Sequence, residues 1–384
     1  MLKIGVIGHG RRIGHMMKDI ARFSEGAKIT AIADIRNEEI KKILGDRAAG
    51  VEFFDTPEAM LDTADLDGVA IGTRCSLHAK MAIKVAKSGL PLFLEKPVAT
   101  TMADLRALKN AFAKSKCQVV VSFPLRLSPL VKLAKELIAA GEIGPLSHVE
   151  AWNHPGYGTD AYYMNWYRDE NETGGLWLQK ATHDFDYLNH VIEAPPLTIS
   201  AMDSKQVYKG TMPAGLKCVD CKLQKECIES PYNRFYKQHL TPEVQPNEFK
   251  CAFAVDTGNH DSATALIRYE GGLHAVYTQC FYARRSAAGR GARLIGQMGT
   301  IHFDWHIGEL ILHKHHTARV VTHKFTSTDG HGGGDDELLH DFIDCMKGKK
   351  NASRSPLSAG LLSGLMCMKA KESCATEKFL PIRW

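Results

Sequence analysis

Short apolar runs alternate with helical patterns over the first 120 residues of the chain. The apolar runs are Ile4–Ile7, Ile29–Ala33, Val69–Ile71, Leu92–Leu94 and Val119–Ser122, and the helical stretches between them include Ile13–Phe23, Ala79–Ser88 and Ala103–Ser115. Strands that are apolar throughout are typical of a parallel sheet covered by helices on both faces. We therefore expect an α/β domain over residues 1–122.

The pattern changes after Phe123-Pro124, where longer β-like stretches follow. They are Leu146–Trp152, Thr198–Gln206, Ala263–Tyr269, Leu273–Cys280, Ala292–Ile295, Gly299–Phe303 and Glu309–His313, with helices over Pro129–Ala140, Leu176–Ile192, about Asp335–Lys347 and Ser358–Glu377. Their lengths and hairpin-like spacing indicate a large, mostly antiparallel sheet. We expect a C-terminal α/β domain over residues 123–384, with an insertion at about 208–251.

Composition and charge narrow the class of protein. The chain has 384 residues, 44% of them hydrophobic, and a net charge of +5 with no clustered basic stripe, so we expect two domains and no nucleic-acid partner. No apolar run reaches the roughly 18 residues that a membrane helix needs. The chain opens on a strand rather than on a signal-peptide pattern. We therefore expect a cytoplasmic protein with no membrane partner and with reduced cysteines.

The first strand and the first helix are joined by a glycine-rich turn, Gly8-His9-Gly10-Arg11-Arg12-Ile13-Gly14. This context is typical of a dinucleotide-binding Rossmann domain, whose glycines let the backbone approach a pyrophosphate at the helix N-terminus. The third glycine stands one place late, so Ile13 must fit near the helix–sheet contact. Asp34 ends the second strand, where a carboxylate binds ribose hydroxyls and repels a 2′-phosphate. These features predict NAD, and Arg36 nearby keeps NADP as an alternative.

Further motifs follow along the chain. They are Thr73-Arg74 and His78, Leu94-Glu95-Lys96-Pro97, Arg126 before Ser128-Pro129, Gly141-Glu142-Ile143-Gly144, the block from Gly174 to Asp186, and His331-Gly332-Gly333-Gly334-Asp335. In this combination the chain resembles, over essentially its whole length, the glucose–fructose oxidoreductase / inositol dehydrogenase / rhizopine catabolism (Gfo/Idh/MocA) family. The resemblance implies a Rossmann domain and a C-terminal α/β domain whose open sheet face forms oligomer contacts, so we expect a homodimer or homotetramer.

The resemblance also implies which residues meet the cofactor. Lys96 would lie near the nicotinamide and the reacting hydroxyl, and Trp166 and Arg168 match positions that approach the nicotinamide end. Together with the glycine turn, the expected cofactor-binding residues are Gly8, Gly10, Arg11, Arg12, Ile13, Asp34, Thr73, His78, Glu95, Lys96, Pro97, Trp166 and Arg168.

The chemistry of hydride transfer requires a proton acceptor. A carbinol carbon gives up a hydride only as its hydroxyl loses a proton, and histidine is the usual base. A neighbouring lysine ammonium stabilises the developing alkoxide charge. We expect His183 and Lys96 in these catalytic roles. Many family members carry an aspartate four residues before the histidine, where this chain has Gln179. The Lys–Asp–His triad is therefore incomplete, and we place Lys180 in the pocket as a second cationic donor to the substrate.

Four more residues are candidates for substrate contact: Arg126, Tyr157, Asp184 and His331. Arg126 could instead lie on the surface, and Tyr157 with the aromatic residues near it could serve ordinary packing rather than stack on a sugar ring. The glycine loop from His331 to Asp335 could close on the substrate or simply lead into a helix. The histidines from His302 to His323 alternate with apolar residues, which favours solvent-facing strand positions over a metal site.

The predicted insertion carries three clustered cysteines in the pattern Cys218-x2-Cys221-x5-Cys227, with Cys251 further on. Four thiolates bind zinc tetrahedrally and could hold together a loop that lacks its own core. Free thiols are the main alternative, and disulfides are a third. A structural zinc ion is therefore a hypothesis beside the predicted NAD.

The sequence as a whole predicts an NAD-dependent oxidoreductase that takes a hydride from a carbinol carbon of a sugar, polyol or sugar derivative. An alternative is a redox-neutral glycoside hydrolase or lyase, in which tightly bound NAD forms a transient keto-sugar. The substitution of the family aspartate by Gln179 keeps that alternative open. A third class is a non-catalytic sensor that retains the Rossmann domain, although Lys96 and His183 argue against it.

Overall fold

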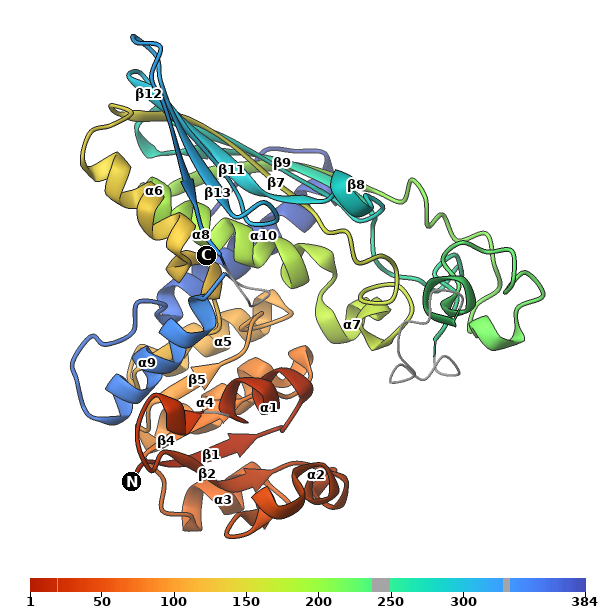
Figure 1. Ribbon diagram of the computed structural model, residues 1–384. Coiled ribbons are helices and arrows are strands. Elements are labelled where there is room, and N and C mark those ends of the chain that lie inside the picture. The colour runs from red at the N-terminus through yellow and green to blue at the C-terminus, as the bar shows by residue number, and fades with distance from the viewer. Residues whose placement is uncertain (19, 237–248, 327–331) are drawn as a thin grey trace.

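The computed structural model describes residues 1–18, 20–236, 249–326 and 332–384, and the first part of the chain forms a six-stranded parallel sheet (Figure 1). The strand order is β3-β2-β1-β4-β5-β6. These strands are β1 (Lys3–Ile7), β2 (Lys28–Ala33), β3 (Glu52–Phe54), β4 (Gly68–Ile71), β5 (Leu92–Leu94) and β6 (Val119–Val121). This order is that of a Rossmann fold, so the predicted fold class is confirmed for this part of the chain.

Helices cover both faces of the parallel sheet, as its wholly apolar strands require. One face packs against α1 (Arg11–Lys18) and α2 (Asn37–Leu44), and the other against α3 (Pro57–Thr63), α4 (His78–Ser88) and α5 (Met102–Phe112). Local signals set some of the helix ends. The side chain of Thr101 accepts a hydrogen bond from the Asp104 amide at 3.1 Å, and α4 ends at Gly89 with φ +74°.

A late helix returns to this sheet. In α9 (Gly334–Met346), the side chains of Leu338, Leu339 and Phe342 pack with Ile4 and Val6 of β1 in one buried cluster. A Cβ on Gly334, the first residue of α9, would lie 1.9 Å from the Pro124 carbonyl oxygen, so this helix starts directly against the backbone after β6. The Rossmann core therefore uses residues that lie far beyond the predicted boundary at 122.

The second part of the chain forms a nine-stranded sheet in the order β14-β13-β12-β11-β7-β10-β9-β8-β15. The strands are β7 (Leu146–His154), β8 (Pro196–Ser204), β9 (Ser262–Tyr269), β10 (His274–Cys280), β11 (Gly289–Gly296), β12 (Gly299–Asp304), β13 (Glu309–Lys314), β14 (Val320–Lys324) and β15 (Leu380–Pro381). β7 and β10 pair in parallel and the other neighbours run antiparallel, which confirms the mostly antiparallel sheet.

One face of this sheet packs against helices. Figure 1 shows α6 (Pro129–Ala139), α8 (Thr182–Ile192) and α10 (Leu357–Thr376) between the sheet and the Rossmann part, and their apolar residues share a buried cluster with the inner sheet positions. The opposite face carries exposed apolar side chains, such as Met202 at 74% and Leu266 at 48% of full exposure. The oligomer contacts expected on this face stay a prediction.

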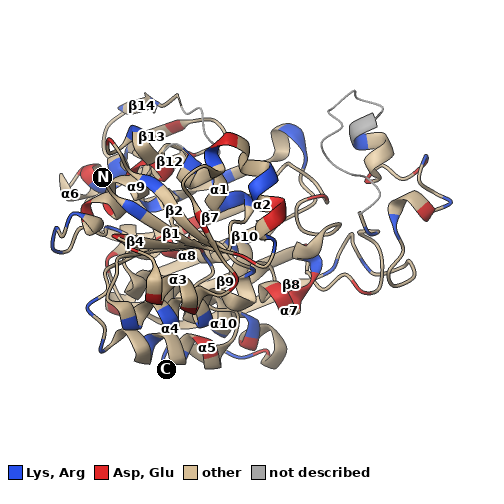
Figure 2. Ribbon diagram, turned by 90° about the horizontal axis from the view of Figure 1, so that it is seen from below, with Lys and Arg blue, Asp and Glu red and all other residues tan. Residues whose placement is uncertain are grey.

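Lys, Arg, Asp and Glu are interspersed over most elements rather than gathered by sign (Figure 2). Within the described ranges, no helix combines the length and the apolar character that a membrane crossing needs. The histidines of β12 and β13, His302 and His313, lie on strand positions that are not buried, as the alternation predicts.

We expect Gly334→Ala to lower the free energy of unfolding by about 1–3 kcal/mol, because the added methyl group overpacks the contact with the Pro124 carbonyl. Gly364→Ala in α10 is the matched control, since its Cβ would lie 3.3 Å from the mobile Cδ1 of Leu105. Urea unfolding of both variants measures the difference. Wild-type stability of Gly334→Ala would contradict the tight docking of α9.

Candidate active site

The glycine turn after β1 lies directly against the segment that follows β4. Gly8 has φ +76°, and a Cβ there would come within 2.8 Å of the Thr73 backbone. A Cβ on Gly10 would lie 2.7 Å from the Gly72 carbonyl oxygen. The two glycines therefore let the turn pack closely against this segment just before the N-terminus of α1, which is where a Rossmann fold binds a pyrophosphate.

The displaced third glycine is compensated at another position. Ile13 is fully buried, and a Cβ on Gly72 would lie 2.2 Å from its Cγ1 atom. Gly72 thus provides the room that the usual glycine at position 13 would leave. Gly14 instead faces the ring of His9, which a Cβ at position 14 would approach to 2.8 Å.

Asp34 directly follows β2, and its side chain is only 5% exposed. Its carboxylate accepts hydrogen bonds from the backbone amides of His9 at 2.8 Å and Arg36 at 2.9 Å. The Arg36 guanidinium also pairs with Asp34 at 3.4 Å. The carboxylate is therefore fixed at the edge of the glycine turn, with the cation that could favour a phosphate already paired to it.

The two arginines of the turn differ in their surroundings. Arg11 is exposed, whereas Arg12 donates two hydrogen bonds to Asp335 at the start of α9, one of them at 2.8 Å. The Nε atom of Arg12 also lies 3.5 Å from Glu95, which is buried at the end of β5. Arg12 thus joins the starts of α1 and α9 to the loop after β5.

His78 holds together the loops after β4 and β5. Its Nδ1 lies 2.8 Å from the Pro97 carbonyl oxygen and its Nε2 lies 3.2 Å from the Thr73 carbonyl oxygen. Burial lowers the pKa of His78, so its ring is neutral and donates to one of the two carbonyls at a time. The structure therefore assigns His78 to positioning two loops against each other, one of which carries Lys96.

Lys96 connects the two sheets. Its ammonium donates a hydrogen bond at 2.8 Å to the backbone oxygen of Gln179, which lies in a π-helical segment (Trp177–Ala181). Such segments are frequent at functional sites. The Gln179 side chain turns away, and its amide donates to the Thr173 oxygen at 3.1 Å and to the Cys75 sulfur at 3.3 Å. Burial lowers the pKa of Lys96, while Cys75 and Glu95 raise it.

Lys180 and His183 follow on the same stretch of helix. Lys180 is 9% exposed, and its Nζ lies 5.2 Å and 5.4 Å from the ring centres of Tyr157 and Tyr162. Burial lowers the pKa of Lys180 well below its usual value, and the charges of Arg290 and Lys96 lower it further. His183 is 5% exposed, with its ring edge-on to Phe123 at 5.7 Å.

Asp184 anchors a buried network that the sequence analysis did not foresee. It accepts hydrogen bonds from Asn153, Tyr277 and Arg290, each at 2.8 Å. Asp184 was a candidate for substrate contact, but these three donors engage its carboxylate. Arg290 is the member of this network that the sequence does not single out. It lies in β11, just before the predicted strand at Ala292–Ile295. Arg290, Ala292 and Leu294 are spaced two residues apart and so share one face of the strand, and this spacing could have indicated that Arg290 points inward.

Three other expected site residues bind or stack on side chains and carbonyls of the protein itself. All three side-chain nitrogens of Arg126 are engaged, two by Asp186 at 2.9 and 2.6 Å and one by the Arg354 carbonyl at 2.8 Å. Arg168 is buried and donates to Asp256, Thr257 and the Cys251 carbonyl. Trp166 stacks on Tyr167 at 3.8 Å, with the Arg74 guanidinium 3.8 Å above its ring. His331 lies outside the described residues.

The predicted zinc site is not confirmed. All ten cysteines are free, and no group of three or more His, Cys, Asp and Glu side chains among the described residues is placed to hold a metal ion. The prediction assumed that the insertion lacks a core. Instead its chain packs around an apolar cluster of Tyr163, Met164, Leu176, Tyr208, Cys218, Phe249, Ala252 and Phe281. Two of the four cysteines, Cys218 and Cys251, are buried there, whereas Cys221 and Cys227 are partly exposed.

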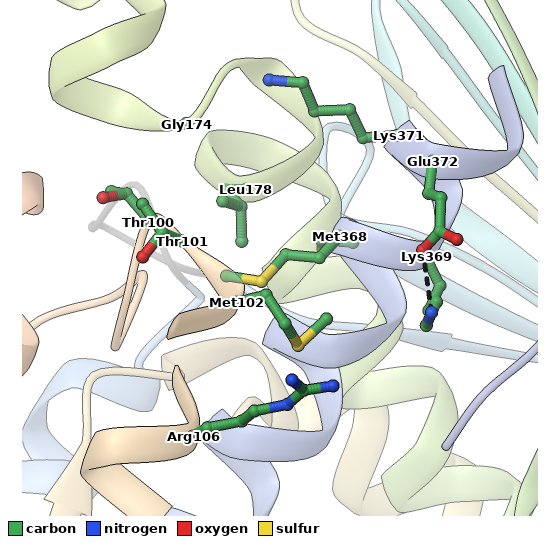
Figure 3. Close-up of a pocket in the computed structure, with 11 residues that line it drawn as sticks. Thr100, Thr101, Met102, Arg106, Gly174, Leu178, Met368, Lys369, Lys371 and Glu372 are labelled. Atoms are coloured by element: carbon green, nitrogen blue, oxygen red, sulfur yellow. Dashed lines mark hydrogen bonds and ion pairs between the residues drawn. The ribbon is translucent and has the colours of Figure 1, made fainter. Parts of the chain in front are cut away.

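A separate cavity of about 410 Å³ lies behind the π-helical segment (Figure 3). Leu178, Met102 and Met368 form its apolar middle, and Lys369, Lys371 and Glu372 of α10 border it. None of the expected catalytic residues is among its lining residues, so it is distinct from the site at Lys96.

Sequence comparisons identify relatives of both parts of the chain. Residues 2–123 match the family model described as the oxidoreductase family, NAD-binding Rossmann fold, and residues 131–302 match that of the GFO/IDH/MocA C-terminal domain. The chain is 27% identical over 387 residues to YteT of Bacillus subtilis (strain 168), a protein named as an oxidoreductase, covering 89% of this chain and 87% of that protein. An inositol 2-dehydrogenase of Rhizobium meliloti (strain 1021) is 25% identical over 214 residues, covering 56% of this chain and 62% of that protein.

A solved structure has the same fold over the whole chain. A levoglucosan dehydrogenase, in complex with NADH and levoglucosan, superposes with a TM-score of 0.76 at 18% identity and covers 100% of both chains. At this identity the likeness establishes the arrangement of the two sheets.

We expect Arg126→Met or Asp186→Asn alone to lower the free energy of unfolding by about 3–5 kcal/mol, because each leaves a buried polar or charged partner unpaired. The control is Glu372→Gln, which breaks an exposed pair with Lys369 and should cost about 0–1 kcal/mol. Denaturant unfolding measures all three. An unchanged stability of Arg126→Met together with a raised KM would restore Arg126 as a substrate contact.

Proposed function

Because the chain belongs to the Gfo/Idh/MocA family of NAD-binding oxidoreductases, we propose that it is an NAD-dependent dehydrogenase of a sugar, polyol or sugar derivative. One observation carries the proposal: the Lys96 ammonium lies 2.8 Å from the Gln179 oxygen, which brings the loop after β5 against the helix that bears Lys180 and His183. Ligands of open α/β sheets bind outside the carboxyl ends of the strands, where this contact lies.

The fit to NAD rests on the glycine turn and on Asp34. The turn leads into the N-terminus of α1, where backbone amides of a Rossmann fold bind a pyrophosphate, and the fixed carboxylate of Asp34 suits two ribose hydroxyls. When bound there, NAD accepts a hydride from the carbinol carbon. Arg36 is already paired with Asp34, which supports NAD over NADP.

The residues of this chain divide the proton chemistry as follows. His183 takes the proton of the reacting hydroxyl. Lys96 uses one of its three N–H donors on Gln179 and holds the hydroxyl oxygen with another, which stabilises the developing negative charge. Lys180 contacts the substrate from the side of Tyr157 and Tyr162. Asp184 holds Arg290 near Lys180.

The redox-neutral hydrolase or lyase is the rival reaction, and the relatives reported above lend it no support. One experiment distinguishes the two. The purified protein is incubated with NAD and a panel of sugars, polyols and glycosides, and nicotinamide absorbance and sugar products are followed in the same tube. NADH with a keto product supports the dehydrogenase. Glycoside cleavage without net NADH would replace it, and NAD binding without any turnover would favour a sensor.

We expect Lys96→Met to reduce kcat by about 100-fold or more, because it removes the donor to the developing alkoxide. NAD affinity should change little, since the turn and Asp34 are untouched. Initial rates and the quenching of protein fluorescence by NADH measure the two effects. Wild-type turnover by Lys96→Met would remove Lys96 from the chemistry.

We expect Asp34→Ser to shift the cofactor preference towards NADP, because the carboxylate that would repel a 2′-phosphate is gone and Arg36 is released from its ion pair. The ratio of kcat/KM for NAD to that for NADP should fall by about 10-fold or more. Glu39→Gln, which removes a second and exposed partner of Arg36, is the matched control. An unchanged ratio in Asp34→Ser would contradict the assigned ribose contact.

A further inference from the structure

One buried cation in the proposed pocket has no anion of its own. In the described part of the chain, the contacts of the Lys180 ammonium are the faces of Tyr157 and Tyr162, and no oxygen accepts a hydrogen bond from it. A buried lysine usually has a carboxylate partner, because an isolated charge away from water is costly. The cost of keeping Lys180 protonated is reflected in its pKa, which burial lowers well below the ordinary value.

The other cations of the proposed site each have an ion-pair partner or a hydrogen-bond acceptor. Arg290 pairs with Asp184 at 2.8 Å, so the nearest carboxylate is already engaged. Arg12 pairs with Asp335 and lies 3.5 Å from Glu95. Lys96 is adjacent to Glu95 in the chain and donates to Gln179. Among the described residues of this group, Lys180 is therefore the cation whose ammonium has neither a carboxylate partner nor a hydrogen-bond acceptor.

Lys180 lies on the substrate side of the proposed site. Lys180 immediately follows Gln179, whose oxygen binds Lys96, and it precedes His183 by about one turn of helix. Its two aromatic neighbours belong to the loop after β7, and the Tyr157 side chain is 43% exposed. A ligand that reacts between Lys96 and His183 therefore passes within reach of the Lys180 ammonium.

We propose that the substrate is an anionic sugar whose carboxylate binds Lys180, with Arg290 behind it, so that the enzyme acts on a hexuronate or related sugar acid. This inference rests on the proposed function and specifies its substrate class. A carboxylate carries one negative charge, which the Lys180 ammonium alone can balance, whereas a phosphate monoester carries about −1.5 to −2 at pH 7. The two tyrosine faces suit the apolar face of the sugar ring beside that carboxylate.

The test compares sugar acids with their uncharged counterparts. D-glucuronate and D-galacturonate are measured against their methyl esters, against glucose and galactose, and against glucose 6-phosphate. Equilibrium binding to the protein with NADH is followed by calorimetry, and NADH formation from NAD is followed separately. Lys180→Met keeps the length of the side chain and removes its charge. Lys135→Met, whose Nζ donates to the His190 carbonyl at 2.8 Å, is the matched control outside the pocket.

We expect at least one acid to bind about 10- to 100-fold more tightly than its ester, the factor typical of a hydrogen bond to a charged group. Lys180→Met should abolish this preference, so that each acid binds no more tightly than its ester, and Lys135→Met should keep it. Equal binding of acids and esters, no binding of either acid, a preference for glucose 6-phosphate, or a preference that survives in Lys180→Met would each overturn the proposal. Acid binding without NADH formation would instead count against the proposed dehydrogenase and leave the charge recognition standing.

Discussion

The hydrogen bond from the Lys96 ammonium to the Gln179 carbonyl is the contact on which the geometry of the site depends. It joins the end of β5 in the parallel sheet to the π-helical segment that leads into α8 beneath the nine-stranded sheet. Because the acceptor is a backbone oxygen, the contact does not need an acidic side chain at position 179. The buried Gln179 amide serves a second purpose, since it ties this segment to the Thr173 carbonyl.

Periodicity and local motifs predicted the two sheets, most helices and the place of the glycine turn. They failed where the deciding contact is distant in the chain. Arg126 is polar and follows a strand, as a ligand-binding arginine would, but Asp186 pairs with it across the fold. Arg290 was missed because only the register of β11 against β7 places it opposite Asn153, where both side chains reach Asp184. The spacing of Cys218 and Cys221 suits zinc, yet the apolar cluster around Tyr208 holds the insertion together.

In the helical stretch from Trp177 to Asp186, residues of the proposed site alternate with residues that stabilise the fold. Lys180 and His183 belong to the proposed pocket, whereas Asp184 and Asp186 bind Arg290 and Arg126 inside the fold. Neighbouring positions on a helix point in directions about 100° apart, so adjacent polar residues meet different surroundings. Residue type alone therefore could not separate the candidates for chemistry from the residues that hold them in place.

The return of α9 to the parallel sheet affects how the chain acquires its structure during synthesis. The apolar positions of β1 and α1 on that face are buried in part by Leu338, Leu339 and Phe342. A ribosome translates the whole nine-stranded sheet except β15 before it reaches these residues. The first-made half thus keeps the part of this apolar face that α9 covers exposed for most of translation, although N-terminal units generally fold first. Completion of the nucleotide-binding half is in this way coupled to the presence of nearly the entire chain.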